Sequence, residues 1–260
     1  MLVSRHFRLS RLKMLGLLNE LEEADDKAVS LCITPGLPPQ QVEDLLEKAL
    51  VPHAVAPEIA ALLARSGTGA ILFWGSSRRL LILPPFPVTG KYIAPGYDLE
   101  PLRSQLARPF SIALVLVRLG AFSVGVCQGE KLITSKTGTG LVHARHKKGG
   151  SSQSRFARHR ERQIDFFLAR VCSHARQQLE PYSPSLDYLV YGGAWTTIHS
   201  LREQCPFLRQ FEDRTLPPLL NISRPRKSVL EAAIGDIWSS SITEWYENEI
   251  PSIDSHQAAV

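Results

Sequence analysis

The sequence contains no pair of cysteines in a C-x-x-C pattern. Its four cysteines are widely separated: Cys32, Cys127, Cys172 and Cys205. Their spacing argues against a zinc ribbon and against a disulfide framework, and it suits a reducing cytoplasm, where we expect the protein to act. The chain also lacks an apolar stretch near the roughly 20 residues that a membrane helix needs, and no apolar region of a secretory signal follows its first basic residues.

Three catalytic signatures are missing as well. No G-x-S-x-G pattern occurs, which argues against a serine hydrolase. The run Lys136-Thr137-Gly138-Thr139-Gly140 lacks the Gly-Lys-Ser/Thr ending of a P-loop and the third glycine of a dinucleotide site. We therefore interpret it as a turn between strands. No internal repeat or long low-complexity segment is present.

The composition supports a substantial core and a moderate excess of positive charge. The chain has 260 residues, 44% of them hydrophobic, with a formal net charge of +5 and a pI near 9.1. A chain of this size can fold as one large domain or two modest ones. The charge becomes informative where it is concentrated, because local clusters of cations attract anionic partners.

The N-terminal segment, residues 1–18, is one basic region. Its cations precede the first acid, Glu20, and they are Arg5, Arg8, Arg11 and Lys13. The segment predicts an amphipathic N-terminal helix. A basic arm on RNA and a transit peptide are the alternatives.

The first part of the chain predicts a small α/β region, residues 1–85. A strand is expected at 29–34, helices at 40–50 and 59–65, and a hairpin at 70–74 and 80–83. Pro84-Pro85-Phe86-Pro87 is the best candidate linker, since proline cannot serve interior ladder positions. We therefore predict a domain boundary between residues 85 and 86.

The second region, residues 86–260, predicts an α/β (α+β) domain with a mixed sheet flanked by helices. An antiparallel meander begins it, and the expected strands are 111–117, 121–127, 132–136 and 141–145. A long helix is expected at 156–179, then a strand at 188–191, a Gly192-Gly193 turn and a helix at 196–203. Pro217-Pro218 and Pro225 indicate a loop. Residues 229–246 predict a closing helix.

The most informative stretch runs from Gly149 to Arg155, with the sequence GGSSQSR. Glycines let a backbone approach a partner closely, and Ser151 or Ser152 suits a helix N-cap. Gln153 is thus expected at or just before a helix N-terminus, where free amides favour anionic groups. Cations surround it: Arg145, Lys147, Lys148, Arg155, Arg158, Arg160, Arg162 and three histidines. Such a cluster favours an RNA partner, although a flexible connector and a solvated helix face are the plainer interpretations.

Two other groups of residues have structural and functional interpretations. His143 and His146, with His159, could hold a metal ion, but no carboxylate or cysteine partner lies near them, so no metal site is expected. Trp195 and Trp238 fall on expected helices, which favours core positions over base-stacking platforms.

The segment from Gly149 to Arg158 resembles the GGQ loop and following helix of archaeal and eukaryotic class I peptide-chain release factors. It is more similar to the bacterial release-factor-like proteins related to the Vms and ankyrin-zinc-finger nascent-chain hydrolases, which space the glycines and the glutamine more widely. The Lys136–Gly138 and Leu141–His146 segments resemble the strand that leads into that loop. The similarity runs from about Pro84 to the C-terminus and is sharpest between positions 131 and 170.

This resemblance implies a ribonuclease-H-like catalytic domain that hydrolyses the ester between a nascent peptide and tRNA. Gln153 would orient the attacking water, and Gly149 and Gly150 would let the loop, residues 147–155, enter the peptidyl-transferase centre. The residues expected to bind RNA are Arg145, His146, Lys147, Lys148, Ser151, Ser152, Arg155, Arg158 and Arg162. The implied partners are the large ribosomal subunit, its rRNA and peptidyl-tRNA, with no cofactor and no membrane, and the protein would act as a monomer.

Since no stop-codon-reading domain is recognisable, the resemblance implies codon-independent release in ribosome rescue or quality control. Two alternatives stay open. One is endonucleolytic cleavage of the tRNA 3′ end, with His143, His146 and His159 supplying the acid and base. The other is a non-catalytic factor that binds ribosomes or tRNA.

Overall fold

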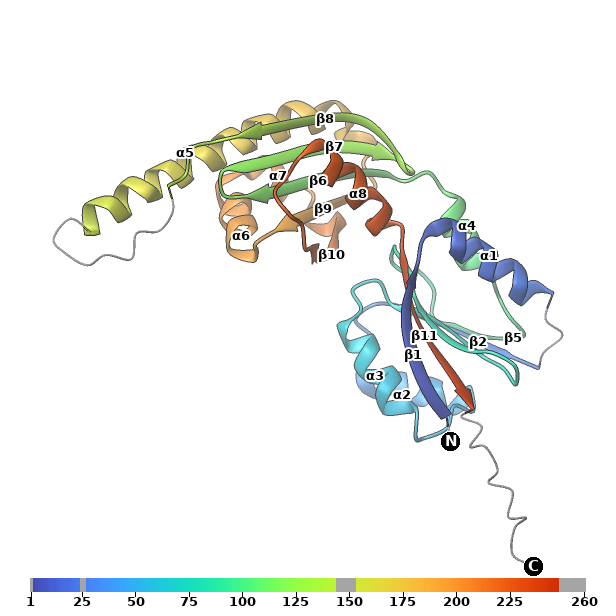
Figure 1. Ribbon diagram of the computed structural model, residues 1–260. Helices are drawn as coiled ribbons and strands as arrows, with labels where there is room; N and C mark the ends of the chain where they lie inside the picture. The colour runs from blue at the N-terminus through green and yellow to red at the C-terminus, as the bar shows by residue number, and fades with distance from the viewer. Residues whose placement is uncertain (1, 24–26, 144–152, 248–260) are drawn as a thin grey trace, which may run out of the picture. The chain divides into compact units, whose positions relative to one another are not determined.

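The computed structural model describes residues 2–23, 27–143 and 153–247. It divides the chain into two compact units (Figure 1). Unit 1 combines residues 1–99 with residues 240–260, and unit 2 consists of residues 100–239. Each unit has its own sheet and its own hydrophobic core. None of the helices in the described part of the chain is long and apolar enough to cross a membrane.

Unit 1 is a six-stranded antiparallel sheet with the order β1-β11-β4-β3-β2-β5. Its strands are β1 (Leu2–Leu9), β2 (Val29–Ile33), β3 (Ala70–Trp74), β4 (Arg79–Leu83), β5 (Tyr92–Pro95) and β11 (Ser240–Glu247). Its helices are α1 (Arg11–Glu22), α2 (Pro39–Lys48) and α3 (Ala56–Arg65). The apolar sides of α2 and α3 pack on the sheet through Leu46 and Ile59, against Leu31 and Leu72. The predicted strand, helices and hairpin between residues 29 and 83 are confirmed.

The N-terminal helix predicted over residues 1–18 is wrong in its first half. Residues 2–9 form β1, which pairs antiparallel with β11, and α1 begins only at Arg11. Phe7 and Leu9 are less exposed than their neighbour Arg8, an alternation with period two that fits a strand. The strand forms because it pairs with β11. Local patterning does not reveal this partner, since β11 lies more than 200 residues away along the chain.

The closing helix predicted over residues 229–246 is also wrong in part. The helix α8 spans Lys227–Ile237, and the chain then enters β11 at Ser240. In β11, Ile242 and Trp245 are buried, and the strand lies between β1 and β4. Branched and aromatic residues of this kind pack well on a pleated surface, and that packing overrides the helical spacing.

The structure divides the chain at other places than the predicted boundary between residues 85 and 86. The proline-rich segment is part of unit 1: Phe86 is fully buried, and Thr68 donates its hydroxyl to the Pro84 carbonyl at 2.8 Å. The backbone N–H of Val88 also bonds to Thr68. Because this segment packs into unit 1, the division falls after Leu99 and again after Ser239.

Unit 2 is built on a five-stranded mixed sheet with the order β10-β9-β6-β7-β8. Its strands are β6 (Ser111–Arg118), β7 (Ala121–Gln128), β8 (Lys131–Thr139), β9 (Tyr188–Gly193) and β10 (Thr215–Leu220). The first three form an antiparallel meander, while β9 runs parallel to β6 and β10 runs parallel to β9. When the five strands are numbered by their order along the chain, they lie side by side in the order 5-4-1-2-3. Only the second strand, β7, runs antiparallel to the other four. This is the ribonuclease-H-like topology, so the expected fold class is confirmed.

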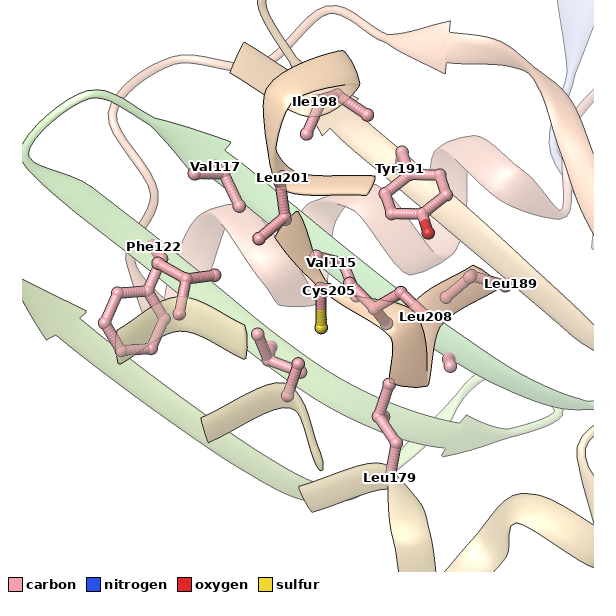
Figure 2. Packing of buried hydrophobic residues seen from close by; sticks show 14 of the residues in the cluster. Val115, Val117, Phe122, Leu179, Leu189, Tyr191, Ile198, Leu201, Cys205 and Leu208 are labelled. Carbon is pink, nitrogen blue, oxygen red and sulfur yellow. The ribbon is translucent and has the colours of Figure 1, made fainter. Parts of the chain in front are cut away.

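Helices cover both faces of this sheet. They are α4 (Glu100–Ala107), α5 (Gln153–Leu179), α6 (Trp195–Gln204), α7 (Pro206–Arg209) and α8, with 3₁₀ turns at Glu180–Ser185 and Glu212–Arg214. Figure 2 shows sheet residues Val115 and Phe122 among the same buried cluster as Leu179, Leu201 and Leu208 of the helical layer. On the opposite face Gly125 of β7 admits α8: a Cβ there would lie 2.8 Å from Leu230 Cδ2.

Several details of unit 2 differ from expectation. The strand predicted at 141–145 is absent over 141–143, because β8 already ends at Thr139; residues 144 and 145 lie outside the described residues. Gly192 and Gly193 belong to β9 rather than to a turn. Pro217 and Pro218 lie within β10, an edge strand, where a missing N–H is tolerated.

The cysteines and tryptophans bring two further corrections. Cys172 of α5 and Cys205 form a disulfide, so the four cysteines do not all stand alone; Cys32 and Cys127 are free and buried. The expectation of a reducing cytoplasm rested on four unpaired cysteines, and this disulfide removes that support. Trp238 is buried as expected and donates its indole N–H to the Gly129 carbonyl, whereas Trp195 is 69% exposed, so its core assignment is wrong.

Candidate nucleic-acid interface

The candidate site is organised by α5, whose 27 residues extend for roughly 40 Å at 1.5 Å per residue. One side of the helix packs on the sheet, as the three- and four-residue spacing predicts, through Leu168, Val171, Ala175 and Leu179, with Ile164 partly buried. The buried side holds the helix rigidly on unit 2. The N-terminal turns of α5 extend past the end of the sheet (Figure 1), and residues 155–159 are exposed there.

Gln153 is the first residue of α5. The expected position at a helix N-terminus is thereby confirmed for its backbone, and its side chain lies outside the described residues. No acidic residue occurs in the first turn. The amides of this turn have no partner within the helix, and their partial positive charge is not offset by a carboxylate in the first turn.

The chain that enters the glycine-rich segment is attached to the flank of α5. Gly140 lies against the helix so closely that a Cβ would be 2.5 Å from Phe167 Cδ2. Three residues later, the backbone N–H of His143 donates to Gln163 Oε1 at 3.1 Å. Arg160 donates its Nε–H to the His143 carbonyl at 3.0 Å. We call Arg160 and Gln163 the clamp.

The residues on either side of the segment 144–152 are both placed by α5. One end is His143, held beside residues 160 and 163, and the other is Gln153 at the start of the same helix. Ten residues of helix separate Gln163 from Gln153, about 15 Å along the axis. Both attachment points of the segment thus belong to a single rigid element of unit 2.

The exposed surface of α5 is strongly cationic. Arg155, Arg158 and Arg162, three of the residues expected to bind RNA, are all exposed on it. Arg170 and Arg176 continue this surface toward the C-terminal end, where Arg176 pairs with Glu180. The acids within α5 are Glu161 and Asp165. An excess of arginine along one exposed helix is the pattern of a phosphate-binding surface.

Two of the three candidate histidines lie together. The rings of His143 and His159 are 6.3 Å apart between centroids, and Gln163 Nε2 lies 3.2 Å from His159 Nε2. His143 thus contacts the clamp through its backbone, and His159 contacts it through its ring. His146, the third, lies outside the described residues.

A family model described as the Actinobacteria/chloroflexi VLRF1 release factor matches residues 111–243, half of the chain. The chain belongs to this release factor family. The match covers the sheet of unit 2, the glycine-rich segment and the whole of α5.

Two curated proteins similar to this chain come from archaea. Peptide chain release factor subunit 1 of Archaeoglobus fulgidus is 31% identical over 125 residues, which cover 47% of this chain and 31% of that protein. The protein of the same name from Aeropyrum pernix is 25% identical over 201 residues, 66% of this chain and 54% of that protein. The chain thus spans about a third to a half of the length of these relatives.

Solved structures with similarity to this release factor include the archaeal translation termination factor aRF1, at 18% identity and a TM-score of 0.39, covering 88% of this chain and 73% of that one. Pelota of Archaeoglobus fulgidus matches at 10% identity and a TM-score of 0.31, with 89% and 63% covered. Both TM-scores are low. The ribonuclease-H-like fold of unit 2 is instead identified by its strand order.

The remaining expected site residues of this release factor lie outside the described residues. They are Arg145, His146, Lys147, Lys148, Gly149, Gly150, Ser151 and Ser152. Their roles stay predictions.

The structure also reveals contacts and positions that the sequence interpretation did not include. Gln163 and Arg160 act on a segment 17 to 20 residues earlier in the chain, which spacing along one helix does not indicate. Phe166 is 75% exposed on α5. Its position could have been recognised, because it lies opposite the apolar positions on a helical projection.

Proposed function

We propose that this release factor hydrolyses the ester of peptidyl-tRNA on the large ribosomal subunit without reading a codon. One observation carries the proposal: in a chain that belongs to a release factor family, Gln153 opens a long cationic helix directly after Gly149-Gly150-Ser151-Ser152. The activity releases nascent chains from stalled ribosomes or subunits, in the cytoplasm, where translation takes place.

In this mechanism Gln153 orients a water molecule against the ester carbonyl, through its backbone N–H or its side-chain amide. A carboxamide does not titrate in the accessible pH range, so its contribution is positioning and electrostatic stabilisation rather than proton transfer. The free amides of the first turn of α5 favour the negative charge that develops on the carbonyl oxygen. Gly149 and Gly150 allow the backbone to approach the reacting group closely.

The arginines of α5 supply the RNA affinity. Arg155, Arg158 and Arg162 are exposed, and the proposal adds Arg145, His146, Lys147, Lys148, Ser151 and Ser152 as contacts near the ester. Contacts of this kind go to phosphates and position the protein without reading sequence. They also make binding strongly dependent on salt concentration.

The decisive experiment is peptide release from purified large subunits that carry peptidyl-tRNA. Gln153→Ala is expected to lower the release rate by roughly a hundredfold, the loss typical of a single stabilising donor. Gln177→Ala is the matched control, since Gln177 is an exposed glutamine of the same helix, 24 residues away. Normal release by Gln153→Ala would contradict the assignment of Gln153.

The proximity of His143 and His159 supports a second candidate function, cleavage of the tRNA 3′ end. Strand scission needs a base and an acid near a 2′-hydroxyl, and two neighbouring imidazoles can supply both. The two reactions give different products, because ester hydrolysis leaves the tRNA at full length. Shortened tRNA in the same assay, lost in His159→Ala but retained in Gln153→Ala, would favour the nuclease. Tight binding without either product would instead indicate a non-catalytic factor.

A further inference from the structure

Phe166 occupies the centre of the outer face of α5, the side opposite the hydrophobic core of unit 2. Its side chain is 75% exposed, while that of its neighbour Phe167 is 2% exposed and lies 6.3 Å from the Phe122 ring. Two adjacent phenylalanines thus take opposite roles: one anchors the helix and the other projects from it.

The surroundings of Phe166 on this face are cationic rather than apolar. Arg162 precedes it by one turn and Arg170 follows it by one turn, at the spacing of helix neighbours. Both arginines are exposed and neither forms an ion pair with any described residue. His159 and Ser173, one further turn to either side, are exposed as well. The nearby acid Asp165 accepts a hydrogen bond from Gln204, which turns it toward α6.

This combination argues against a protein partner and in favour of RNA. A contiguous exposed apolar patch marks many protein-binding surfaces, whereas Phe166 stands alone among charged side chains. An isolated aromatic ring between cations is instead the arrangement that binds unpaired nucleotides, in which the ring stacks on a base and the cations contact the phosphates. Every base offers a stacking face, so such a contact tolerates any sequence.

We propose that Phe166 stacks on an unpaired nucleotide of the large-subunit ribosomal RNA, with Arg162 and Arg170 on the adjoining phosphates. The proposal rests on the proposed function, because it assumes that α5 enters the large subunit. Phe166 lies 13 residues beyond Gln153, about 20 Å along the helix axis. With Gln153 at the ester, this distance places the ring away from the reacting tRNA terminus, among the surrounding rRNA.

A salt titration of binding distinguishes stacking from charge attraction. The full-length protein is mixed with large subunits and, separately, with a labelled single-stranded oligoadenylate of about twelve nucleotides, a length within the usual site size. Phe166→Leu is expected to weaken both complexes roughly tenfold, with an unchanged slope of affinity against salt, because stacking releases no counterions. Arg170→Gln is expected to lower that slope by about one.

Phe166→Trp keeps an aromatic face and is expected to bind at least as tightly as the wild-type protein. Ile133→Ala is the matched control, since it removes another exposed apolar side chain of unit 2, on β8, and is expected to bind normally. Melting temperatures of all variants establish that folding is unchanged. Equal affinities of Phe166→Leu and wild type for large subunits would overturn the proposal, as would a loss of affinity confined to the oligoadenylate.

The same measurements distinguish a failure of the stacking proposal from a failure of the proposed function. Gln153→Ala should bind subunits and oligoadenylate as the wild type does, and yet release peptide roughly a hundredfold more slowly. If wild-type protein releases no peptide while Phe166→Leu still weakens binding to subunits, the stacking contact stands and the hydrolase proposal fails. If release is normal in Phe166→Leu and binding is unchanged, the stacking proposal alone fails.

Discussion

Cys127 shows how burial controls the chemistry of a single residue in unit 2. It lies on β7, has no exposed surface, and burial raises the pKa of its thiol to about 12. Cys32 of unit 1 is similarly buried, and burial raises the pKa of its thiol too. Because the thiolate is the reactive form of cysteine, both free thiols are unreactive in the folded protein near neutral pH.

A pH-dependent stability follows from Cys127. Its pKa in the folded protein lies above the ordinary value of 9.0, so the unfolded chain releases the proton first as the pH rises. The contribution of Cys127 to stability is complete below pH 9.0 and is lost as the pH rises toward about 12. We expect the free energy of unfolding to decline more steeply from about pH 9 upward in the wild type than in Cys127→Ala. Urea denaturation at a series of pH values measures this, and parallel declines in both proteins would contradict it.

At the scale of a single element, α5 combines three tasks on different sides of one helix. Its inner side builds the core of unit 2, one flank holds His143 through the clamp, and the outer side carries the arginines and Phe166. A helix packed along most of its length is rigid. It therefore fixes the positions of His143, Gln153 and the cationic surface relative to one another.

The clamp can be tested directly at His143. Gln163→Leu removes the acceptor of the His143 N–H, a hydrogen bond worth about 1 kcal/mol. The protection of the His143 amide against hydrogen exchange should therefore fall by roughly fivefold. In the release assay the same variant should lower the rate at saturating subunits more than it weakens binding, since it disturbs positioning.

Gln177→Leu provides the control, because Gln177 is exposed on the same helix. Gln163→Glu retains a side-chain oxygen and should restore the protection of His143. If the His143 amide exchanges equally fast in the wild type and in Gln163→Leu, the clamp does not hold this segment.

At the scale of the whole molecule, the chain leaves unit 1 at Leu99 and returns to it at Ser240. The returning strand β11 lies in the interior of the sheet of unit 1, paired with β1 and β4. Its Glu244, with a side chain only 8% exposed, accepts hydrogen bonds from Arg5 at 2.8 Å and from Arg78 at 2.7 Å. Unit 1 is therefore complete only when residues from both ends of the chain have come together.

Truncation after Ser239 should consequently unfold unit 1 and leave unit 2 folded. The deletion removes the ladder partners of β1 and β4 and leaves Arg78, whose side chain is 33% exposed, without its buried carboxylate, a loss of several kcal/mol in total. Hydrogen exchange resolved by segment should show lost protection in residues 2–83 and retained protection in residues 111–220. Truncation after Glu247, which keeps β11, is the control. Retained protection of β3 and β4 after truncation at Ser239 would contradict the prediction.

Strong local signals identified much of the fold in advance. The periodic apolar positions of α5 correspond to buried residues, and the turns of the meander between β6, β7 and β8 were marked by short polar or glycine-containing runs. The strands β1 and β11 were not predicted because they pair with each other across about 240 residues, and β11 pairs on its other side with the distant β4. No local pattern reports a partner at that distance.

The sequence by itself determined that Gln153 stands at the start of a cationic helix, because N-terminal signals, helical periodicity and charge are properties of neighbouring residues. Only the tertiary structure decided that His143 is held by Gln163 and Arg160 and that Cys172 forms a disulfide with Cys205. These outcomes depend on which surfaces the sheet covers, and packing between distant segments settles that question. Local propensity does not.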